Sequence, residues 1–477
     1  MKIRSLVTAV SATSAAMLLG QMNAIALPGE EGEALLPAGP DVIVGDIPDV
    51  AAYATGTVNG VTYASYSIGS TSCNVGTVQL QWQPMPSTKH PTIPQNMYRV
   101  KGGAIEQIGL SWCKHGFCAL QQDICGTCTS AGTGCPTVLG IGCSDPYTAS
   151  LNGQQSDLKS RGPINPSTGV FPSNYSDPSS SSSGLPDSLQ KRLIVDRNDL
   201  NPSLNPGASY FAECQYIHVD DASAGNDNNN ASYRPLSVGS TWGNFGYGLD
   251  VSGTTQRGQP GIYAWKSIHS DVSVKTVDVE GDGRFLVAYR VTPNGNGTWH
   301  YEYAIQNLNS VRAGGSFSVP LPAGVTVTNI GFKSPKYLNG EGYTNAAWTA
   351  TQANGKLTWT CEPNTQSNAN ALRWATLYNF RFDANSAPSE APATLGLWKA
   401  PSVLSPVASV SVAALSPSAP APPCPASDSN CDGEVNGVDL GNLLAQWGTD
   451  GSMDLSLDGV VNGVDLGLLL SDWGPTN

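Results

Sequence analysis

The fold class is decided by Arg284-Phe-Leu-Val-Ala-Tyr-Arg-Val-Thr292, followed by Pro293-Asn-Gly-Asn-Gly297 and Thr298-Trp-His-Tyr-Glu-Tyr-Ala-Ile305. Large and smaller side chains alternate in the last run, so its aromatic residues share one face of a strand: Trp299, Tyr301 and Tyr303. The opposite face carries His300, Glu302 and Ala304. Period-two alternation beside an Asn/Gly turn predicts an antiparallel β-hairpin.

Similar short runs surround this hairpin between residues 266 and 399. They are separated by turn-forming residues and lie at Ser316–Val319, Val325–Phe332, Lys356–Cys361, Leu377–Asp383 and Leu395–Lys399. About seven strands within about 130 residues are typical of an antiparallel β-sandwich. We interpret the aromatic stripe of the hairpin as core packing, with a sugar-binding platform as the alternative.

The composition of the whole chain agrees with a mainly β protein. The 477 residues include 52 Gly and 34 Pro, which predicts many turns and excludes a long helical bundle. Charged residues make up 13% of the chain, and the formal net charge is −13. Because nucleic-acid binding needs a basic surface, this charge argues against a nucleic-acid partner.

Residues 27–265 have fewer clear strand signals, at Tyr63–Ile68, Val78–Trp82 and Ala104–Trp112. Cysteines crowd into one part of this region: Cys113, Cys118, Cys125, Cys128, Cys135 and Cys143. In an exported chain such cysteines predict disulfides, so we expect a β-rich body with a disulfide-rich insertion. Zinc held by Cys125 and Cys128 is the alternative. The full chain has 11 cysteines, so at least one is left over, with Cys73, Cys214 and Cys361 as candidates.

Residues 400–423 separate this body from the C-terminal segment. They are rich in Pro, Ser, Ala and Val and carry no charge, which predicts an extended tether. Residues 424–477 behind it hold nine acidic residues and no Lys or Arg. Such a segment repels itself unless cations neutralise it.

The C-terminal segment is an internal repeat. Asp428-Ser-Asn-Cys-Asp-Gly-Glu-Val-Asn-Gly-Val-Asp-Leu440 recurs as Asp454-Leu-Ser-Leu-Asp-Gly-Val-Val-Asn-Gly-Val-Asp-Leu466, and each copy precedes a short apolar helical run. Oxygen-bearing residues at this spacing predict an EF-hand-like calcium loop. The expected ligands, of which Glu434 and Val460 act through the backbone carbonyl, are Asp428, Asn430, Asp432, Glu434, Asn436, Asp439, Asp454, Ser456, Asp458, Val460, Asn462 and Asp465. An acidic turn without metal is the alternative. We expect Val435 and Val461 to pair the two loops.

The repeat, the linker and Cys424 ahead of the first loop together resemble a type I dockerin of the kind found on secreted planctomycete proteins. The resemblance implies a small α-helical module that binds two Ca²⁺ ions and docks to a cohesin-like receptor, with Cys431 as a disulfide partner for Cys424. Cohesin-binding dockerins carry Ser-Thr-like pairs where both loops here have Gly-Val, at Gly437-Val438 and Gly463-Val464. Another surface receptor or a sorting role is therefore an equal alternative.

The body resembles a set of secreted planctomycete-type proteins. The matching residues are His90-Pro91, Ser111-Trp112 with Lys114-His115-Gly116-Phe117, Gly142-Cys-Ser-Asp-Pro-Tyr147 and Asn370-Ala-Leu-Arg-Trp374. This resemblance implies a shared fold and brings no activity with it.

The start of the chain is typical of a secretory signal. Lys2 and Arg4 precede the apolar run Leu6–Gly20, and Ala24-Ile-Ala26 fits a cleavage site. We expect residues 1–26 to be removed and the protein to be secreted, with attachment to the cell surface as one outcome. An uncleaved anchor helix is the alternative. No later run of about 18 apolar residues exists, so we do not expect a protein integral to the membrane.

The sequence of the body does not define a catalytic site. It contains neither HExxH nor GxSxG, and no carboxylate pair stands out as glycoside hydrolysis would require. His90 and His115 are candidates for a copper or zinc site, with ordinary loop histidines as the alternative. The oxygen-rich run 220–230 is either a third calcium site or a solvated loop. We therefore expect a displayed binding or structural protein, with a polysaccharide-acting enzyme, an O-glycosyl hydrolase, as the alternative.

Overall fold

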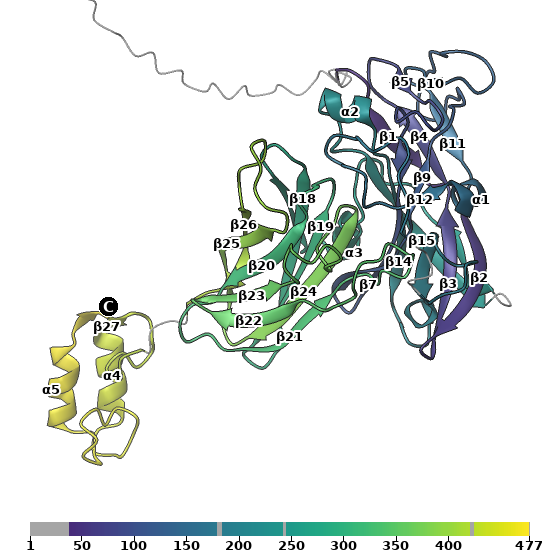
Figure 1. Ribbon diagram of the computed structural model, residues 1–477. Helices are drawn as coiled ribbons and strands as arrows, with labels where there is room; N and C mark the ends of the chain where they lie inside the picture. Colours follow the sequence, from purple (N-terminus) through teal and green to yellow (C-terminus); the bar gives the residue numbers. More distant parts are fainter. Residues whose placement is uncertain (1–37, 179–183, 242–244, 420–423, 477) are drawn as a thin grey trace, which may run out of the picture. The chain divides into compact units, whose positions relative to one another are not determined.

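The computed structural model of the protein describes residues 38–178, 184–241, 245–419 and 424–476. The expected signal segment, part of a serine-rich run at 179–183 and the end of the expected tether at 420–423 lie outside these ranges. The named strands pair antiparallel throughout. The prediction of a mainly β, antiparallel fold is confirmed (Figure 1).

Two five-stranded sheets form the sandwich predicted around the hairpin. The first has the order β17 (Ser273–Asp278), β18 (Arg284–Pro293), β19 (Trp299–Asn307), β24 (Thr376–Ala384) and β21 (Val327–Lys333). The second has the order β22 (Thr349–Ala353), β23 (Lys356–Thr360), β20 (Gly314–Pro320), β25 (Pro388–Leu397) and β26 (Ser409–Pro417).

Aromatic side chains fill the space between these two sheets. Tyr301 and Phe382 stack with ring centroids 4.9 Å apart on the first sheet. Phe380 meets Phe317 of the second sheet at 5.1 Å and Trp359 at 5.4 Å. All five side chains are buried. Of the hairpin stripe, Tyr301 and Tyr303 are buried and Trp299 is half-buried against the same core, so the stripe is core packing and not a sugar-binding platform.

Smaller sheets build the part of the body that precedes residue 265. A five-stranded sheet has the order β16 (Tyr247–Val251), β15 (Ala231–Thr241), β14 (Ser209–Gln215), β7 (Gln95–Lys101) and β8 (Ala104–Leu110). One three-stranded sheet has the order β1 (Val42–Asp46), β4 (Ser70–Asn74) and β11 (Ser144–Tyr147). Another has the order β13 (Leu193–Asp196), β3 (Val61–Ile68) and β2 (Val50–Val58). The shortest strands form a third three-stranded sheet with the order β12 (Leu158–Lys159), β9 (Cys113–His115) and β6 (Thr92–Ile93). They also form a two-stranded sheet of β10 (Val138–Leu139) and β5 (Leu80–Gln81).

The described helices of the body are short and lie in its connections. They are α1 (Ala149–Asn152), the 3-10 turns Gln155–Asp157 and Arg197–Leu200, α2 (Val219–Ala224) and α3 (Tyr263–Ile268). No helix in the described part of the chain is long and apolar enough to cross a membrane.

A buried arginine ties distant segments of the body together. Arg161 donates from Nε to the Ser111 carbonyl at 2.6 Å, from Nη1 to the Ala375 carbonyl at 3.1 Å and from Nη2 to the Gln95 carbonyl at 3.0 Å. Leu377 N also donates to Gln107 Oε1 at 2.7 Å. The expected boundary at 265/266 therefore falls inside a region with continuous contacts, and α3 runs across it.

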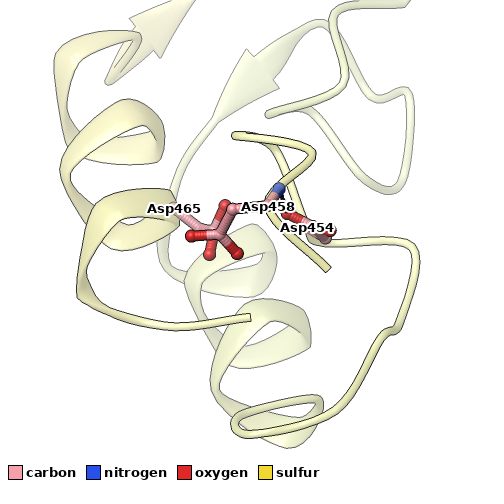
Figure 2. A group of neighbouring side chains, drawn as sticks. All are labelled: Asp454, Asp458 and Asp465. Atoms are coloured by element: carbon pink, nitrogen blue, oxygen red, sulfur yellow. Dashed lines mark hydrogen bonds between the residues drawn. The ribbon is translucent and has the colours of Figure 1, made fainter. Parts of the chain in front are cut away.

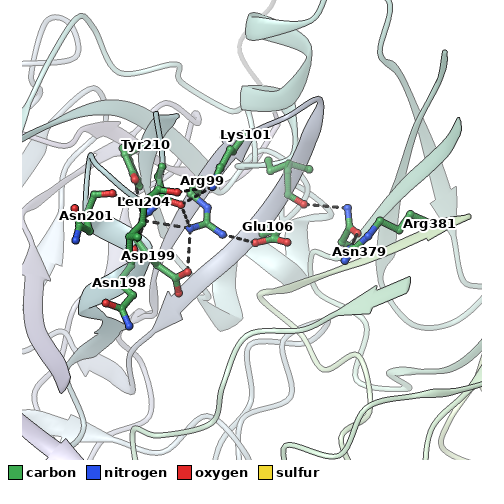
Figure 3. Close-up of polar contacts among 12 residues, drawn as sticks. Arg99, Lys101, Glu106, Asn198, Asp199, Asn201, Leu204, Tyr210, Asn379 and Arg381 are labelled. Atoms are coloured by element: carbon green, nitrogen blue, oxygen red, sulfur yellow. Dashed lines mark hydrogen bonds and ion pairs between the residues drawn. The ribbon is translucent and has the colours of Figure 1, made fainter. Parts of the chain in front are cut away.

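A second arginine organises charges on the five-stranded sheet of β7 (Figure 3). Arg99 forms ion pairs with Glu106 at 2.7 Å and with Asp199 at 2.9 Å, and it donates to Asn205 Oδ1 at 2.7 Å. The side chains of all three charged residues are at most 22% exposed. Because neighbouring carboxylates raise it against the opposing effect of burial, the pKa of Arg99 lies above its usual value.

Three disulfides are present, which confirms the prediction of a disulfide-containing insertion. They join Cys73 to Cys125, Cys118 to Cys135 and Cys128 to Cys143. Cys73 is therefore paired, contrary to its place among the leftover candidates. Cys113 was expected to be bonded, yet it is a free buried thiol beside free Cys214 and Cys361. Since Cys125 and Cys128 are both oxidised, they have no thiolate to offer zinc.

The expected tether contains one more strand of the sandwich. Residues Ser409–Pro417 form β26, which pairs with Pro388–Gly396 of β25. Ala414 is buried on this strand, and Val410 and Val412 pack against the sandwich core. The lack of charge in this segment thus reflects a sheet-edge strand and not only an extended linker.

Candidate calcium loops

The C-terminal residues fold into two loop–helix repeats. Helix α4 spans Gly437–Ala445 and α5 spans Gly463–Ser471. Asn436 caps α4 by accepting from Val438 N at 2.8 Å, and Asn462 caps α5 by accepting from Val464 N at 2.7 Å. In each repeat an aspartate three residues later accepts from the cap backbone, which completes a capping box. Asn436 and Asn462, which are expected calcium ligands at position 9 of each loop, therefore also cap the helices.

Three carboxylates converge in the second loop (Figure 2). Asp454, Asp458 and Asp465 each place an oxygen within 4.8 Å of the others. Among the described residues, this is the group of three His, Cys, Asp or Glu side chains close enough to share a metal ion. Two ligands of one Ca²⁺ ion at about 2.3–2.6 Å lie at most about 5 Å apart, so this spacing fits calcium. The donors are all oxygens, as a hard cation requires, so the residues present fit the expected metal.

Backbone N–H groups hold these carboxylates in place. Asp454 accepts from Asp458 N at 3.1 Å and from Gly459 N at 2.8 Å, which curls the loop around the carboxylate. Asp458 accepts from Val460 N at 3.0 Å. The Val460 carbonyl accepts from Asn462 Nδ2 at 2.9 Å, so this expected ligand is turned toward another loop residue. Ser456 donates its hydroxyl to Asp454 at 3.3 Å.

The first loop repeats this pattern with small differences. Asp428 accepts from Asp432 N at 3.3 Å and from Gly433 N at 3.0 Å, and Glu434 N donates to Asp432 at 3.0 Å. Asn430 donates from Nδ2 to Asp432 at 2.8 Å, a contact that draws this carboxylate toward the amide. The carboxylates of the first loop do not form a triad as tight as that of the second loop in the described structure.

The residue at position 12 of each loop is the best-held acid. Asp439 accepts from Ser429 N at 2.8 Å and Asn436 N at 2.9 Å, and Asp465 accepts from Ser456 N at 2.8 Å and Asn462 N at 2.7 Å. Burial alone raises the pKa of an acid, but these N–H donors outweigh it and hold both pKa values below the usual range. Both groups are thus ionised and ready to bind a cation at neutral pH.

The loops share their backbone turns. Gly433 has φ +88° and Gly459 has φ +94°, and Cys431 and Leu457 at position 4 have φ +56° and +59°. A glycine at position 6 is favoured because other residues meet a steric cost in this region. The sequence identified the glycines, whereas the equivalent turn at position 4 carries no sequence signal.

Each loop is completed by the segment that follows the helix of the other repeat. Strand β27 (Glu434–Val435) pairs with β28 (Gly474–Pro475). Val461 donates to the Thr449 carbonyl at 2.7 Å and accepts from Gly448 N at 2.8 Å. The expectation that Val435 and Val461 pair with each other is therefore wrong, because each pairs with a residue beyond the opposite helix.

The apolar residues of this module divide into a small core and an exposed set. Its buried members are Val435, Leu443, Met453, Val461 and Leu469. Six of the exposed members form pairs at equivalent positions of the two repeats: Val438 and Val464, Leu444 and Leu470, Trp447 and Trp473. Each of these six side chains is at least 47% exposed. Sequence reasoning did not separate the exposed set from the core of the helices.

The cysteines near the first loop are thiols in this structure. Cys424 Sγ donates to the Asp428 carbonyl at 2.6 Å, and Cys431 Sγ lies 3.8 Å from the same oxygen. Because both sulfurs are turned to one carbonyl, the disulfide implied by the family resemblance is not formed.

The structure also brings His90 and His115 together. His90 Nε2 lies 2.8 Å from His115 Nδ1, and His90 Nδ1 lies 2.7 Å from the Gln83 carbonyl. A carbonyl can only accept, so His90 carries its proton on Nδ1, and its Nε2 accepts from His115 Nδ1. Burial lowers the pKa of His90 to about 4 and that of His115 to about 3, so both rings are neutral at pH 7. This pair leaves one ring lone pair, on His115 Nε2, instead of the two that a shared metal needs.

His115 lies at the wall of an open cleft of about 550 Å³. Lys114, Asp157 and Lys159 also line it, and Lys114 forms an ion pair with Asp157 at 3.0 Å. Asp157 is the one acid of the lining, so the cleft does not supply the two carboxylates of a glycoside hydrolase.

Comparisons with protein-family models and with curated proteins found no match for this sequence.

Proposed function

We propose that residues 424–477 form a dockerin-like module that binds two Ca²⁺ ions and attaches an exported β protein to a surface partner. The observation that carries the proposal is the convergence of Asp454, Asp458 and Asp465 within 4.8 Å, in a loop whose turns are repeated in the first copy. Three carboxylates so close repel one another strongly, and the segment contains no Lys or Arg to compensate them. Calcium supplies the missing charge.

Calcium also fits the folding of the module. Its core has five buried apolar residues, which is little for a unit that stands behind a linker. Metal binding contributes directly to folding when the ligands converge only in the folded state. We therefore expect α4 and α5 to depend on calcium.

The test is a count of bound calcium on the full-length chain after dialysis, with Asp439→Asn and Asp465→Asn as variants. Each variant removes one ligand charge, and each is expected to lower the count by one. Asp450→Asn is the matched control, because Asp450 is an exposed acid of the same module outside the ligand set. A wild-type count that neither ligand variant changes would contradict the proposal.

The exposed apolar pairs support docking to a protein. An apolar surface repeated twice on an acidic module suits a receptor with an apolar centre and a basic rim. The measurement is surface plasmon resonance of the full chain over an immobilised type I cohesin domain in calcium. We expect binding that Trp447→Ala with Trp473→Ala reduces at least tenfold. Val403→Ala is the control, since Val403 is a 98% exposed apolar side chain of the body. Absence of wild-type binding would exclude a cohesin-type receptor.

Export is the remaining part of the proposal. The three disulfides support an oxidising compartment. We expect mass spectrometry of the protein recovered outside the cell to give a first residue near Leu27. A chain that retains residues 1–26 would instead support the anchor alternative.

A further inference from the structure

An oxygen-rich cluster lies in the body, far along the sequence from the calcium loops. Asp41 precedes β1, Asp221 belongs to α2, and Asn229 and Asn230 lie between α2 and β15. Asp41, Asp221 and Asn230 are 0% exposed. Acids are rarely buried to this degree without a partner of opposite charge.

Hydrogen bonds join these residues into a ring. Val42 N donates to Asp221 Oδ1 at 2.9 Å, and Asn230 Nδ2 donates to Asp221 Oδ2 at 2.7 Å. Asn229 Nδ2 donates to Asp41 Oδ2 at 3.1 Å. The backbone closes the ring, because Asp41 is bonded to Val42 and Asn229 to Asn230. Three separate segments of the chain are thereby held together.

Three oxygens of this ring have no hydrogen-bond partner in the described structure: Asp41 Oδ1, Asn229 Oδ1 and Asn230 Oδ1. Each belongs to a carboxylate or amide whose other polar atom is bonded within the ring. A buried acceptor without a partner costs about 1–3 kcal/mol, and native structures rarely leave several together. Such a set indicates a bound ion or water.

The charge of the ring distinguishes these two occupants. Within the described residues, neither Asp41 nor Asp221 forms an ion pair with a basic side chain. A water molecule would satisfy the oxygens but leave two carboxylates side by side in an apolar interior.

We propose that Asp41, Asp221, Asn229 and Asn230 bind a calcium ion that is independent of the C-terminal loops. Every available donor is an oxygen of a carboxylate or an amide, which is the ligand set of Ca²⁺. Zinc and copper sites usually include imidazole nitrogen or thiolate sulfur, and the ring contains no His or Cys. Water and backbone carbonyls complete the coordination.

The competing explanation is a neutral, protonated Asp221. Both of its oxygens already accept hydrogen bonds, from Val42 N and from Asn230 Nδ2. A proton on either oxygen would need an acceptor of its own in addition to these two donors. A calcium ion would instead use lone pairs that the two hydrogen bonds leave free.

The decisive variant is Asp41→Asn in the full-length chain. The amide keeps an oxygen for Asn229 and removes only the negative charge, so it preserves the hydrogen bonds of the ring. We expect the calcium count after dialysis to fall by one relative to wild type. Asp250→Asn on β16 is the matched control, because Asp250 is an exposed acid of the body that forms no part of the ring. It is expected to leave the count unchanged.

A second variant covers the case in which Asp41→Asn does not fold. Asn229→Ala removes one unpartnered oxygen at a half-buried position and is expected to weaken calcium binding at this site at least tenfold in a titration. Equal counts and affinities for wild type and both variants would overturn the proposal and favour the neutral acid. The variants Asp439→Asn and Asp465→Asn test the calcium loops independently. If they lose calcium while the variants of the ring do not, the proposed body site is wrong and the proposed calcium loops are unaffected.

Discussion

The body and the C-terminal module differ in what compensates their charge and buries their apolar surface. In the body, aromatic rings of two sheets pack with centroids within 6 Å, and three disulfides cross-link the insertion. Arg99 and Arg161 each bond to several partners. In the module, five apolar residues are buried while nine large apolar side chains of its helices and loops are exposed, and the segment contains no Lys or Arg to pair with its acids.

This difference shows how the same chain can combine a self-sufficient part with a dependent one. The sandwich obtains its stability from apolar burial, which no ligand controls. Under the proposed function, the module depends on a cation to compensate its acids and on a partner to cover its exposed apolar side chains. Changes to the core should therefore act on the body alone, and changes to charge should act in opposite directions on the two regions.

The largest effect is expected from emptying the aromatic core. Phe380 contacts Phe317, Trp348 and Trp359 at centroid distances of 5.1, 5.4 and 5.4 Å. Phe380→Ala should lower the free energy of unfolding of the body by about 3–5 kcal/mol, through lost burial and a residual cavity. Urea unfolding followed by tryptophan emission measures it. Ile330→Ala at a 36% exposed position is the control and should cost under about 1 kcal/mol. A changed helical signal or a changed calcium affinity of the C-terminal loops would contradict the separation of the two regions.

Removal of a disulfide is expected to rank next. The bond between Cys118 and Cys135 closes a loop with a sequence separation of 17. The double variant Cys118→Ala with Cys135→Ala should cost the body about 2–4 kcal/mol, because the unfolded chain regains the freedom of this loop. The urea midpoint of oxidised protein, compared with protein in dithiothreitol, gives the measurement. The helical signal of the module should be unaffected by the reductant, and a parallel loss would argue against this assignment.

Acid should separate the two regions by the sign of its effect. Burial raises the pKa of Asp145 to about 7, so the body loses stability as pH rises from about 4 to about 7, by roughly 2 kcal/mol after allowance for residual solvent. Asp439 and Asp465 have lowered pKa values, so the stability that they contribute is present above the unfolded pKa near 4 and is lost as pH falls through their folded values.

The variants for this prediction are Asp145→Asn and Asp465→Asn. Asp145→Asn should remove the slope of body stability between pH 4 and 7, and Asp465→Asn should flatten the loss of helical circular dichroism in acid. If both regions gained stability in the same direction of pH, the assignment of a raised pKa to Asp145 and of lowered pKa values to Asp439 and Asp465 would be wrong.

The smallest effect is expected at the loop glycines. Gly459 has φ +94° and open space around its Cα, so Gly459→Ala brings only backbone strain, about 1–2 kcal/mol in the module. Gly281 in the body has φ +66°, but a Cβ there would meet the Leu404 carbonyl, so Gly281→Ala should cost more. Thermal unfolding of the two variants in calcium ranks them. Gly459→Asn serves as a control that tolerates the left-handed region, and it should behave nearly like wild type.

The sequence predicted those parts of the fold that depend on local patterns. Alternation identified the hairpin of β18 and β19, and the repeated Asp, Asn and Gly spacing identified both loops and the starts of their helices. These features are local, because a face of a strand or a turn at a fixed position is set by neighbours in sequence.

Features that depend on distant partners were not predictable. Nothing near Cys73 indicates that it bonds to Cys125, and nothing in the spacing of His90 and His115 indicates a shared hydrogen bond. Strand β26 was missed because Pro and Ser dominate its segment, while its partner β25 supplies the missing backbone hydrogen bonds. The ring of Asp41, Asp221 and Asn230 likewise joins residues whose separation hides their contact.

The exchange of pairing segments between the two repeats has a topological consequence. Gly474 and Pro475 complete the first loop, and Thr476 N donates to the Gly433 carbonyl at 2.9 Å. The first loop is therefore synthesised well before Gly474 and Pro475, the residues that pair with it. A cut after Trp473 would remove the pairing of the first loop, although that loop lies farther from the cut in sequence. The second loop would keep its pairing with Gly448 and Thr449. Each repeat therefore needs a segment of the other to complete the backbone pairing of its loop.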